Sequence, residues 1–108
     1  MPITREFRQT VLIRAQTDRQ FRQAMLTEAI NELLGGDLAA GKAMLRDYIN
    51  ATITFDRLAK ALKRPSKSLQ RMLGPRGNPT AESIFSIIKV LQGTEQVQLQ
   101  VRATKKAA

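Results

Sequence analysis

The chain has 108 residues, enough for one domain that buries its own core without a metal ion or a disulfide. It contains no cysteine and no histidine, which excludes disulfides, the usual zinc sites, and catalysis by a cysteine or histidine nucleophile or base. Its net charge of +9 suits a polyanionic partner, which could be DNA, RNA or an anionic membrane surface.

The first part of the chain predicts two N-terminal helices within residues 4–34, because apolar side chains recur there at helical spacing. Asp18 is a suitable N-cap for the second helix, and the glycine pair at 35–36 ends it. The apolar residues of the first helix are Phe7, Val11 and Leu12. Those of the second helix are Phe21, Met25, Leu26, Ala29, Ile30, Leu33 and Leu34.

The middle of the chain, residues 37–92, predicts a helical core. Asp37, Thr54 and Thr80 are suitable N-caps for three helices, the last of which ends near Gly93. The apolar positions of these helices are Leu38, Met44, Leu45, Tyr48 and Ile49, then Phe55, Leu58, Ala59 and Leu62, and finally Ile84, Phe85, Ile87, Ile88 and Leu91.

Between the last two of these helices the chain turns and begins another short helix. Pro65 disfavours a helical conformation at the residue before it, yet proline is accepted in the first turn of a new helix. Residues 66–73 are predicted to form that helix. Residues 74–79 are predicted to form a loop, in which Gly74 and Gly77 supply backbone freedom. The inward positions of the short helix are Leu69, Met72 and Leu73.

Apolar and polar residues alternate along residues 96–102, which predicts a β-strand. A lone strand must find an edge for its backbone, and another copy of itself across a dimer axis would provide one. Residues 103–108 are expected to be a disordered tail. The predicted fold is therefore mainly all-α, a bundle of five to six helices with a helix-turn-helix at 54–73 and one short C-terminal strand, within a single domain over 1–102.

Seven basic residues and no acidic one lie between Arg57 and Arg76. A DNA duplex carries about one negative charge per 1.7 Å of its axis, so such a cluster is attracted to it whatever the base sequence. The alternative is a solvated helix face, but ordinary surface helices mix their charges, because oppositely charged pairs three or four residues apart stabilise them. That compensation is absent here. The seven residues are Arg57, Lys60, Lys63, Arg64, Lys67, Arg71 and Arg76.

Residues 58–73 supply the parts of a DNA-binding helix-turn-helix: a bracing helix, a sharp turn, and a second helix with exposed side chains. Leu62 and Leu69 are placed to form the contact between the two helices. Lys63 stands where such motifs usually have glycine, and Arg64 stands where an apolar residue is common. The sequence departs from the generic motif at these two positions.

Residues 66–80, SKSLQRMLGPRGNPT, resemble the addiction-module antidote proteins, which are small bacterial regulators with a helix-turn-helix of the phage-repressor (Xre/Cro) type. Residues 36–52 match as well, and the resemblance covers most of residues 5–101. Its most specific part is the segment 74–80. The resemblance implies an all-helical fold, DNA binding and, often, control of the protein's own operon beside a small toxin gene. It places the recognition helix on residues 66–73.

The exposed face of this recognition helix suits base contacts. Lys67 and Arg71 could donate hydrogen bonds to guanine, and Gln70 could read adenine, each good bidentate pair giving roughly 1–3 kcal/mol of discrimination. Hydroxyls, cations and the backbone amides that open the helix suit phosphate contacts. The predicted phosphate-binding residues are Thr54, Lys60, Arg64, Ser66, Ser68 and Arg76.

We therefore expect a homodimeric regulator, a repressor, that binds double-stranded DNA, since one short recognition helix reads only a few base pairs. An alternative is a protein whose main role is to bind a small toxin as its antitoxin. RNA binding is less expected, because single-strand recognition stacks bases on exposed aromatic rings and the five aromatic residues here all sit in apolar stripes.

An enzyme is the least expected function class. The scattered carboxylates have no partnering histidine, cysteine or phosphate-binding loop, so we predict no catalytic residue, cofactor or metal. No apolar run approaches the roughly 20 residues that cross a bilayer, and the first residues lack the apolar core of a signal peptide. A soluble, cytoplasmic protein without a membrane partner is expected.

Overall fold

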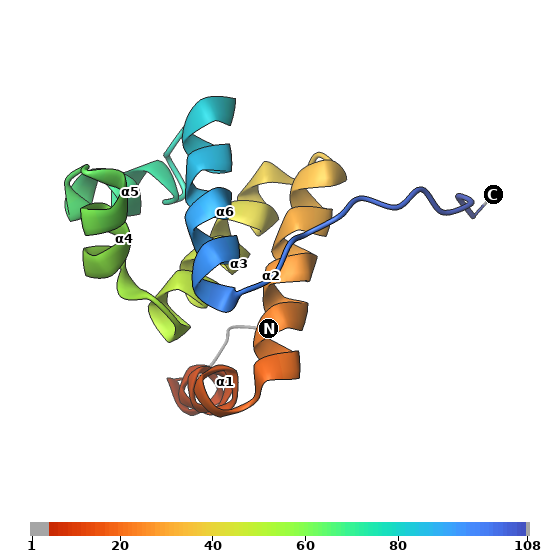
Figure 1. The fold of residues 1–108 in the computed structure, drawn as a ribbon, viewed down its shortest axis with the longest axis horizontal. Coiled ribbons are helices and arrows are strands. Elements are labelled where there is room, and N and C mark those ends of the chain that lie inside the picture. The colour runs from red at the N-terminus through yellow and green to blue at the C-terminus, as the bar shows by residue number, and fades with distance from the viewer. Residues whose placement is uncertain (1–4, 108) are drawn as a thin grey trace.

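The structure is a computed structural model that describes residues 5–107, and within that range it contains six α-helices and no β-strand (Figure 1). Thr4, where the first predicted helix begins, lies outside the described residues. The prediction of a mainly all-α protein is confirmed for the described part. The helices are α1 (Arg5–Thr17), α2 (Arg19–Leu34), α3 (Leu38–Ala51), α4 (Thr54–Leu62), α5 (Ser66–Met72) and α6 (Ala81–Glu95).

Three of the four predicted N-caps are confirmed. The side chains of Asp18, Asp37 and Thr80 each accept a hydrogen bond from the backbone N–H three residues later, at 3.1, 3.0 and 3.1 Å. The prediction for Thr54 was wrong. Thr54 begins α4 with a φ of 71°, and no side-chain hydrogen bond caps that helix. A capping side chain needs extended backbone at its own residue, and this left-handed conformation does not provide it.

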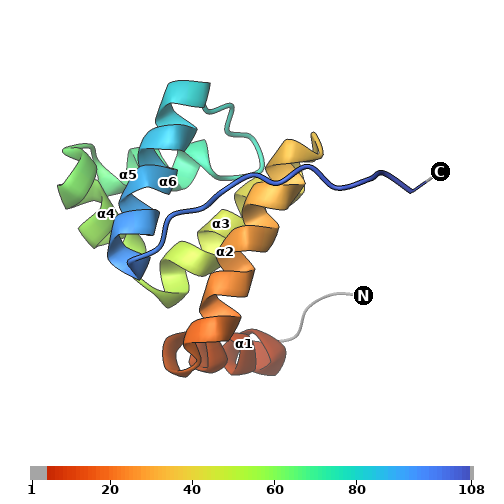
Figure 2. The same ribbon diagram turned by 45° about the vertical axis from the view of Figure 1, so that its right-hand side comes forward.

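The core lies between α2 and α3 on one side and α4, α5 and α6 on the other, while α1 packs across α2 and α3 (Figure 2). Gly41 lets α2 and α3 approach closely, because a Cβ there would lie 2.4 Å from Leu33 Cδ2. Every helix except α1 contributes a large, fully buried side chain. These side chains are Leu26, Leu45, Tyr48, Ile49, Leu58, Leu69, Leu73, Ile87 and Leu91, with Leu73 following α5 directly.

A buried polar cluster joins α2, α3 and α6. Arg22 Nε donates to both carboxylate oxygens of Glu95, at 2.8 and 3.1 Å, and the Tyr48 hydroxyl donates to the same carboxylate. Arg22 also reaches the carbonyl oxygen of Ala15 in α1, at 3.1 Å. Burial by itself would raise the pKa of Glu95, but the hydrogen bonds from Arg22 and Tyr48 outweigh it and hold that pKa below its ordinary value. Burial raises the pKa of Tyr48, so its hydroxyl remains a donor.

Several residues of the predicted apolar stripes are exposed. Phe85 in α6 is 67% exposed, Leu34 at the end of α2 is 63% exposed, and Phe7 in α1 is 56% exposed. Leu38 in α3 is also exposed. The helical spacing indicates which side of a helix is apolar, but the positions of the neighbouring helices decide how much of that side they cover.

The prediction of a C-terminal strand was wrong for the single chain. Residues 97–107 contain neither helix nor strand, and they form an extended segment that starts beside α6, crosses α2 and ends away from the helices (Figures 1 and 2). Val97 and Leu99 are half-buried while Gln98 and Gln100 are exposed, so side-chain burial alternates from residue to residue over 97–100, as it does in a strand. A strand also needs a neighbouring strand to bond with, and the described residues contain none.

The end of the chain was predicted to be a disordered tail over 103–108. Residues 103–107 are exposed and contain no helix or strand, and Ala108 lies outside the described residues. Among the helices described, none is both long enough and apolar enough to cross a membrane.

Candidate nucleic-acid interface

The turn between α4 and α5 has a left-handed residue at its centre. Lys63 adopts φ 55° and ψ 45°, and the backbone N–H groups of Lys63 and Arg64 bond back to the carbonyl oxygens of Lys60 and Ala59, at 3.4 and 3.1 Å. This pattern of paired bonds is the Schellman motif, in which glycine usually occupies the left-handed position. The turn therefore has the backbone geometry that glycine would favour, although the residue is lysine.

The short helix α5 has one buried face and one exposed face. Leu69 and the following Leu73 are fully buried, and Met72 packs against the same core. On the other side Lys67, Gln70 and Arg71 are exposed. Their spacing of three and four residues places these polar side chains on one surface of the helix. The structure thus brings together the three residues that were predicted to read bases.

Two cations of α3 hold the C-terminal end of α5 and the loop that follows it. Lys42 is only 4% exposed, and its Nζ donates to the carbonyl oxygens of Gly74, at 3.0 Å, and Gly77, at 2.7 Å. Arg46 donates to the carbonyl oxygen of Leu73. Both charges lie at the negative end of the α5 dipole, where cations are favourable.

Sequence reasoning missed this anchor. The only signal in the sequence was that Lys42 and Arg46 are cations four residues apart on a helix with many core residues. This spacing does not indicate which carbonyl groups accept their hydrogen bonds.

Gly77 is required by close packing, not by an unusual φ. A Cβ at this position would lie 2.0 Å from the Met72 carbonyl oxygen and 2.4 Å from that of Arg71. Among the described glycines only Gly36 has a positive φ, so the expectation that Gly74 and Gly77 supply backbone freedom was wrong. The loop instead folds tightly against the end of α5, where only a hydrogen atom fits.

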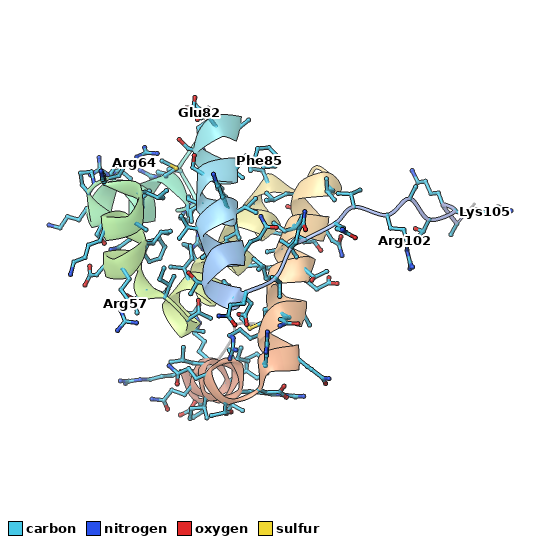
Figure 3. The ribbon with its side chains drawn as sticks, viewed as in Figure 1. Arg57, Arg64, Glu82, Phe85, Arg102 and Lys105 are labelled. Atoms are coloured by element: carbon cyan, nitrogen blue, oxygen red, sulfur yellow. The ribbon has the colours of Figure 1, made fainter. Side chains whose placement is uncertain are left out.

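The basic residues of the α4–α5 pair form no ion pair with another described residue. Six of the seven are exposed, and only Arg64 is half-buried. The only ion pairs among residues 5–107 are Arg14–Asp18 and Arg22–Glu95, neither of which involves this cluster. Figure 3 shows Arg57 and Arg64 on the α4–α5 side of the molecule. The cluster forms a cationic surface over two helices and their turn, as the sequence predicted.

The predicted phosphate-binding residues differ in how they are placed. Lys60 on α4 and Arg76 in the loop after α5 are exposed. Arg64 donates to the Ser83 hydroxyl of α6 at 3.0 Å, so part of its guanidinium already holds the turn against α6. Thr54 lies at the far end of α4, about 12 Å along the helix axis from the turn.

Two serines lie at the start of α5 and are half-buried. Ser66 accepts a hydrogen bond from Gln70 Nε2 at 3.0 Å, which restricts the Gln70 side chain along the helix surface. Ser68 lies between the two faces, as predicted. Ser66 therefore acts first as a partner of Gln70.

No family model, curated protein or solved structure matches the chain. The resemblance to the addiction-module antidote proteins stays a prediction from residues 36–52 and 66–80.

Proposed function

We propose that this protein is a sequence-specific, double-stranded DNA-binding transcriptional regulator, a repressor that acts as a homodimer and reads base edges with α5. The observation that carries this proposal is the exposed face of α5, where Lys67, Gln70 and Arg71 lie together next to a helix, α4, whose cations form no ion pair within the described part of the chain. A recognition helix lies in the major groove, so side chains on its exposed face can reach the edges of adjacent base pairs.

The division of labour between base and phosphate contacts follows from position. Arg71 presents a planar fork that suits guanine, and Gln70 has donor and acceptor atoms that suit adenine. Lys60 in α4, Lys63 in the turn before α5 and Arg76 in the loop after it are all exposed and are suited to phosphates. Lys42 and Arg46 support this function by fixing the end of α5, although they do not face the solvent side of it.

The aromatic residues favour a duplex over a single strand as the partner. Phe55 is the aromatic residue of the α4–α5 pair, and it is buried. Phe7 and Phe85 are exposed, contrary to the prediction, but they belong to α1 and α6. The cationic surface therefore offers no exposed ring on which an unpaired base could stack, which single-strand recognition uses.

The test is a salt-titrated binding assay that compares a duplex from upstream of the protein's own gene with a scrambled duplex of equal length. A specific regulator favours its site by about 10³-fold or more, and its affinity falls steeply with salt for both duplexes. If the two duplexes bind equally over the whole salt range, the assay is repeated with a genomic library of duplexes. Equal binding to every duplex of that library would contradict sequence-specific regulation.

The antitoxin role stays a prediction from the family resemblance. Its test is co-purification of the chain with the product of a small neighbouring gene, and the absence of such a gene would remove the basis for this role.

A further inference from the structure

A groove with an apolar lining lies on the side of α6 that faces away from α4 and α5. It is bounded by α2, α6 and residues 99–102 of the extended segment, and its volume is about 240 Å³. Figure 2 shows the segment running beside these two helices, and Figure 3 shows Phe85 on this side of α6.

Exposed apolar side chains concentrate in this groove. Leu34, Phe85 and Val101 all line it, and they are 63%, 67% and 79% exposed. They are half of the six large apolar side chains that are exposed among the described residues. Scattered single residues of this kind are normal on a surface, whereas three around one groove indicate a surface that a partner covers.

The extended segment leaves one edge of its backbone unpaired. Within residues 98–107 the structure records one hydrogen bond, from the Leu99 N–H to Gln92 Oε1 at 2.7 Å. In an extended chain the N–H and C=O groups of alternate residues point to opposite edges. The edge that includes Leu99 therefore faces α6, and the backbone groups of Gln98, Gln100 and Arg102 form the open edge.

From these observations we infer that the groove and the open edge form the interface between two copies of this chain. A second copy supplies both things that the surface needs, an extended segment for the open edge and exposed apolar side chains for the groove. Two such segments related by a two-fold axis pair antiparallel, each open edge bonding to the other, as isologous interfaces require. Phe85 and Val101 of each copy are then covered by the other.

In this two-fold pairing, Gln100 lies nearest the axis. With Gln98, Gln100 and Arg102 on the open edge, the axis passes closest to Gln100, which pairs with Gln100 of the second copy through both backbone groups. The inference rests on the proposed function in one respect, since it names the second copy of the proposed homodimer. The groove lies across α6 from the cationic surface, so both surfaces can be occupied together.

The test is sedimentation equilibrium of the full chain over a range of protein concentrations. The wild type is expected at twice the 12.1 kDa chain mass, about 24 kDa. Phe85→Asp removes an apolar anchor from each copy and is expected to weaken dimerisation by about 30-fold or more. Gln100→Pro removes the N–H at the axis and is expected to weaken it comparably.

Matched controls separate the interface from general damage. Gln100→Ala keeps the backbone N–H and should remain dimeric. Ile13→Asp places the same charge on an apolar side chain of α1 that is 59% exposed and lies outside the groove, and it should also remain dimeric. Circular dichroism of each variant checks that the helices persist, and the position of Gln100 outside every helix makes its proline variant compatible with folding.

A wild type that stays at 12 kDa overturns the inference, as does a dimer that neither Phe85→Asp nor Gln100→Pro weakens. DNA binding is measured separately on the same samples. A dimer that shows no sequence preference contradicts sequence-specific regulation and leaves the interface intact. A monomeric wild type that binds one specific half-site contradicts the interface and the homodimer, and leaves sequence-specific DNA binding intact.

Discussion

Arg71 and Lys60 are both exposed cations of the α4–α5 pair, but they lie on different helices and we expect them to act differently. Arg71→Ala should weaken binding to a specific duplex by roughly 1–3 kcal/mol and affect a scrambled duplex much less. Lys60→Ala should weaken both duplexes alike and flatten the slope of log affinity against log salt by about one unit. Fluorescence anisotropy with both duplexes at several salt concentrations measures both effects. Identical behaviour of the two variants would contradict this division of roles.

Lys42 shows how a charge can be buried when its ammonium group has enough acceptors. Lys42→Met keeps most of the side-chain volume but leaves the carbonyl oxygens of Gly74 and Gly77 without that donor. We expect the free energy of unfolding to fall by about 1–3 kcal/mol, the usual penalty for a buried unpaired group. Urea denaturation measures it, with Lys89→Met on the exposed side of α6 as the control. A loss no larger than that of the control would show that the Lys42 contacts do not stabilise the loop.

At the scale of elements, the α4–α5 turn tests whether the left-handed conformation of Lys63 costs stability. Lys63→Gly removes the Cβ and should raise the free energy of unfolding by roughly 1 kcal/mol relative to Lys63→Gln. Both variants lose the same charge, so both should flatten the salt dependence of DNA binding equally. Thermal unfolding of the two proteins gives the comparison. If the glycine variant were the less stable of the two, the positive φ of Lys63 would be the wrong description of this turn.

The helix ends show which elements could be predicted from the sequence. Asp18, Asp37 and Thr80 were recognisable as caps because a cap bonds to a backbone N–H only three residues away. The segment over 97–102 was a different case. Its alternating side chains predicted a strand, but strand formation depends on a second extended chain, which the described part of one molecule does not contain.

At the scale of the whole molecule, the Arg22–Tyr48–Glu95 cluster joins helices from both ends of the chain. Because the folded-state pKa of Glu95 is lowered, its contribution to stability is present above the unfolded value, near 4.5, and is lost as the pH falls through the folded value. Glu95→Gln should therefore lower the free energy of unfolding by about 2 kcal/mol at pH 7, a typical value for hydrogen bonds to a charged group.

The pH dependence separates this charge from general packing. The difference between the wild type and Glu95→Gln should be constant from pH 7 down to about 5 and should shrink below about 4.5. Urea denaturation at each pH measures it, and Glu28→Gln on the exposed surface of α2 is the control. A difference that stayed constant down to pH 3 would contradict the lowered pKa of Glu95.

The amino-acid sequence by itself determined the helices, most of their caps and the cationic stretch from Arg57 to Arg76. These features depend on residues within about one helical turn of each other, or on composition, and so they can be recognised without knowing the fold. The exposed positions of Lys67, Gln70 and Arg71 followed for the same reason, since Leu69 and Leu73 indicate the opposite face.

Only the tertiary structure decided which distant groups meet. Arg22 and Glu95 are 73 positions apart, and Lys42 reaches carbonyl groups more than 30 positions away, so no local pattern predicts either contact. The same limit explains Phe85. Phe85 does lie in an apolar stripe, as its spacing indicates, but it is exposed. Whether such a residue is buried depends on where the neighbouring helices end and, in our proposal, on a second copy of the chain.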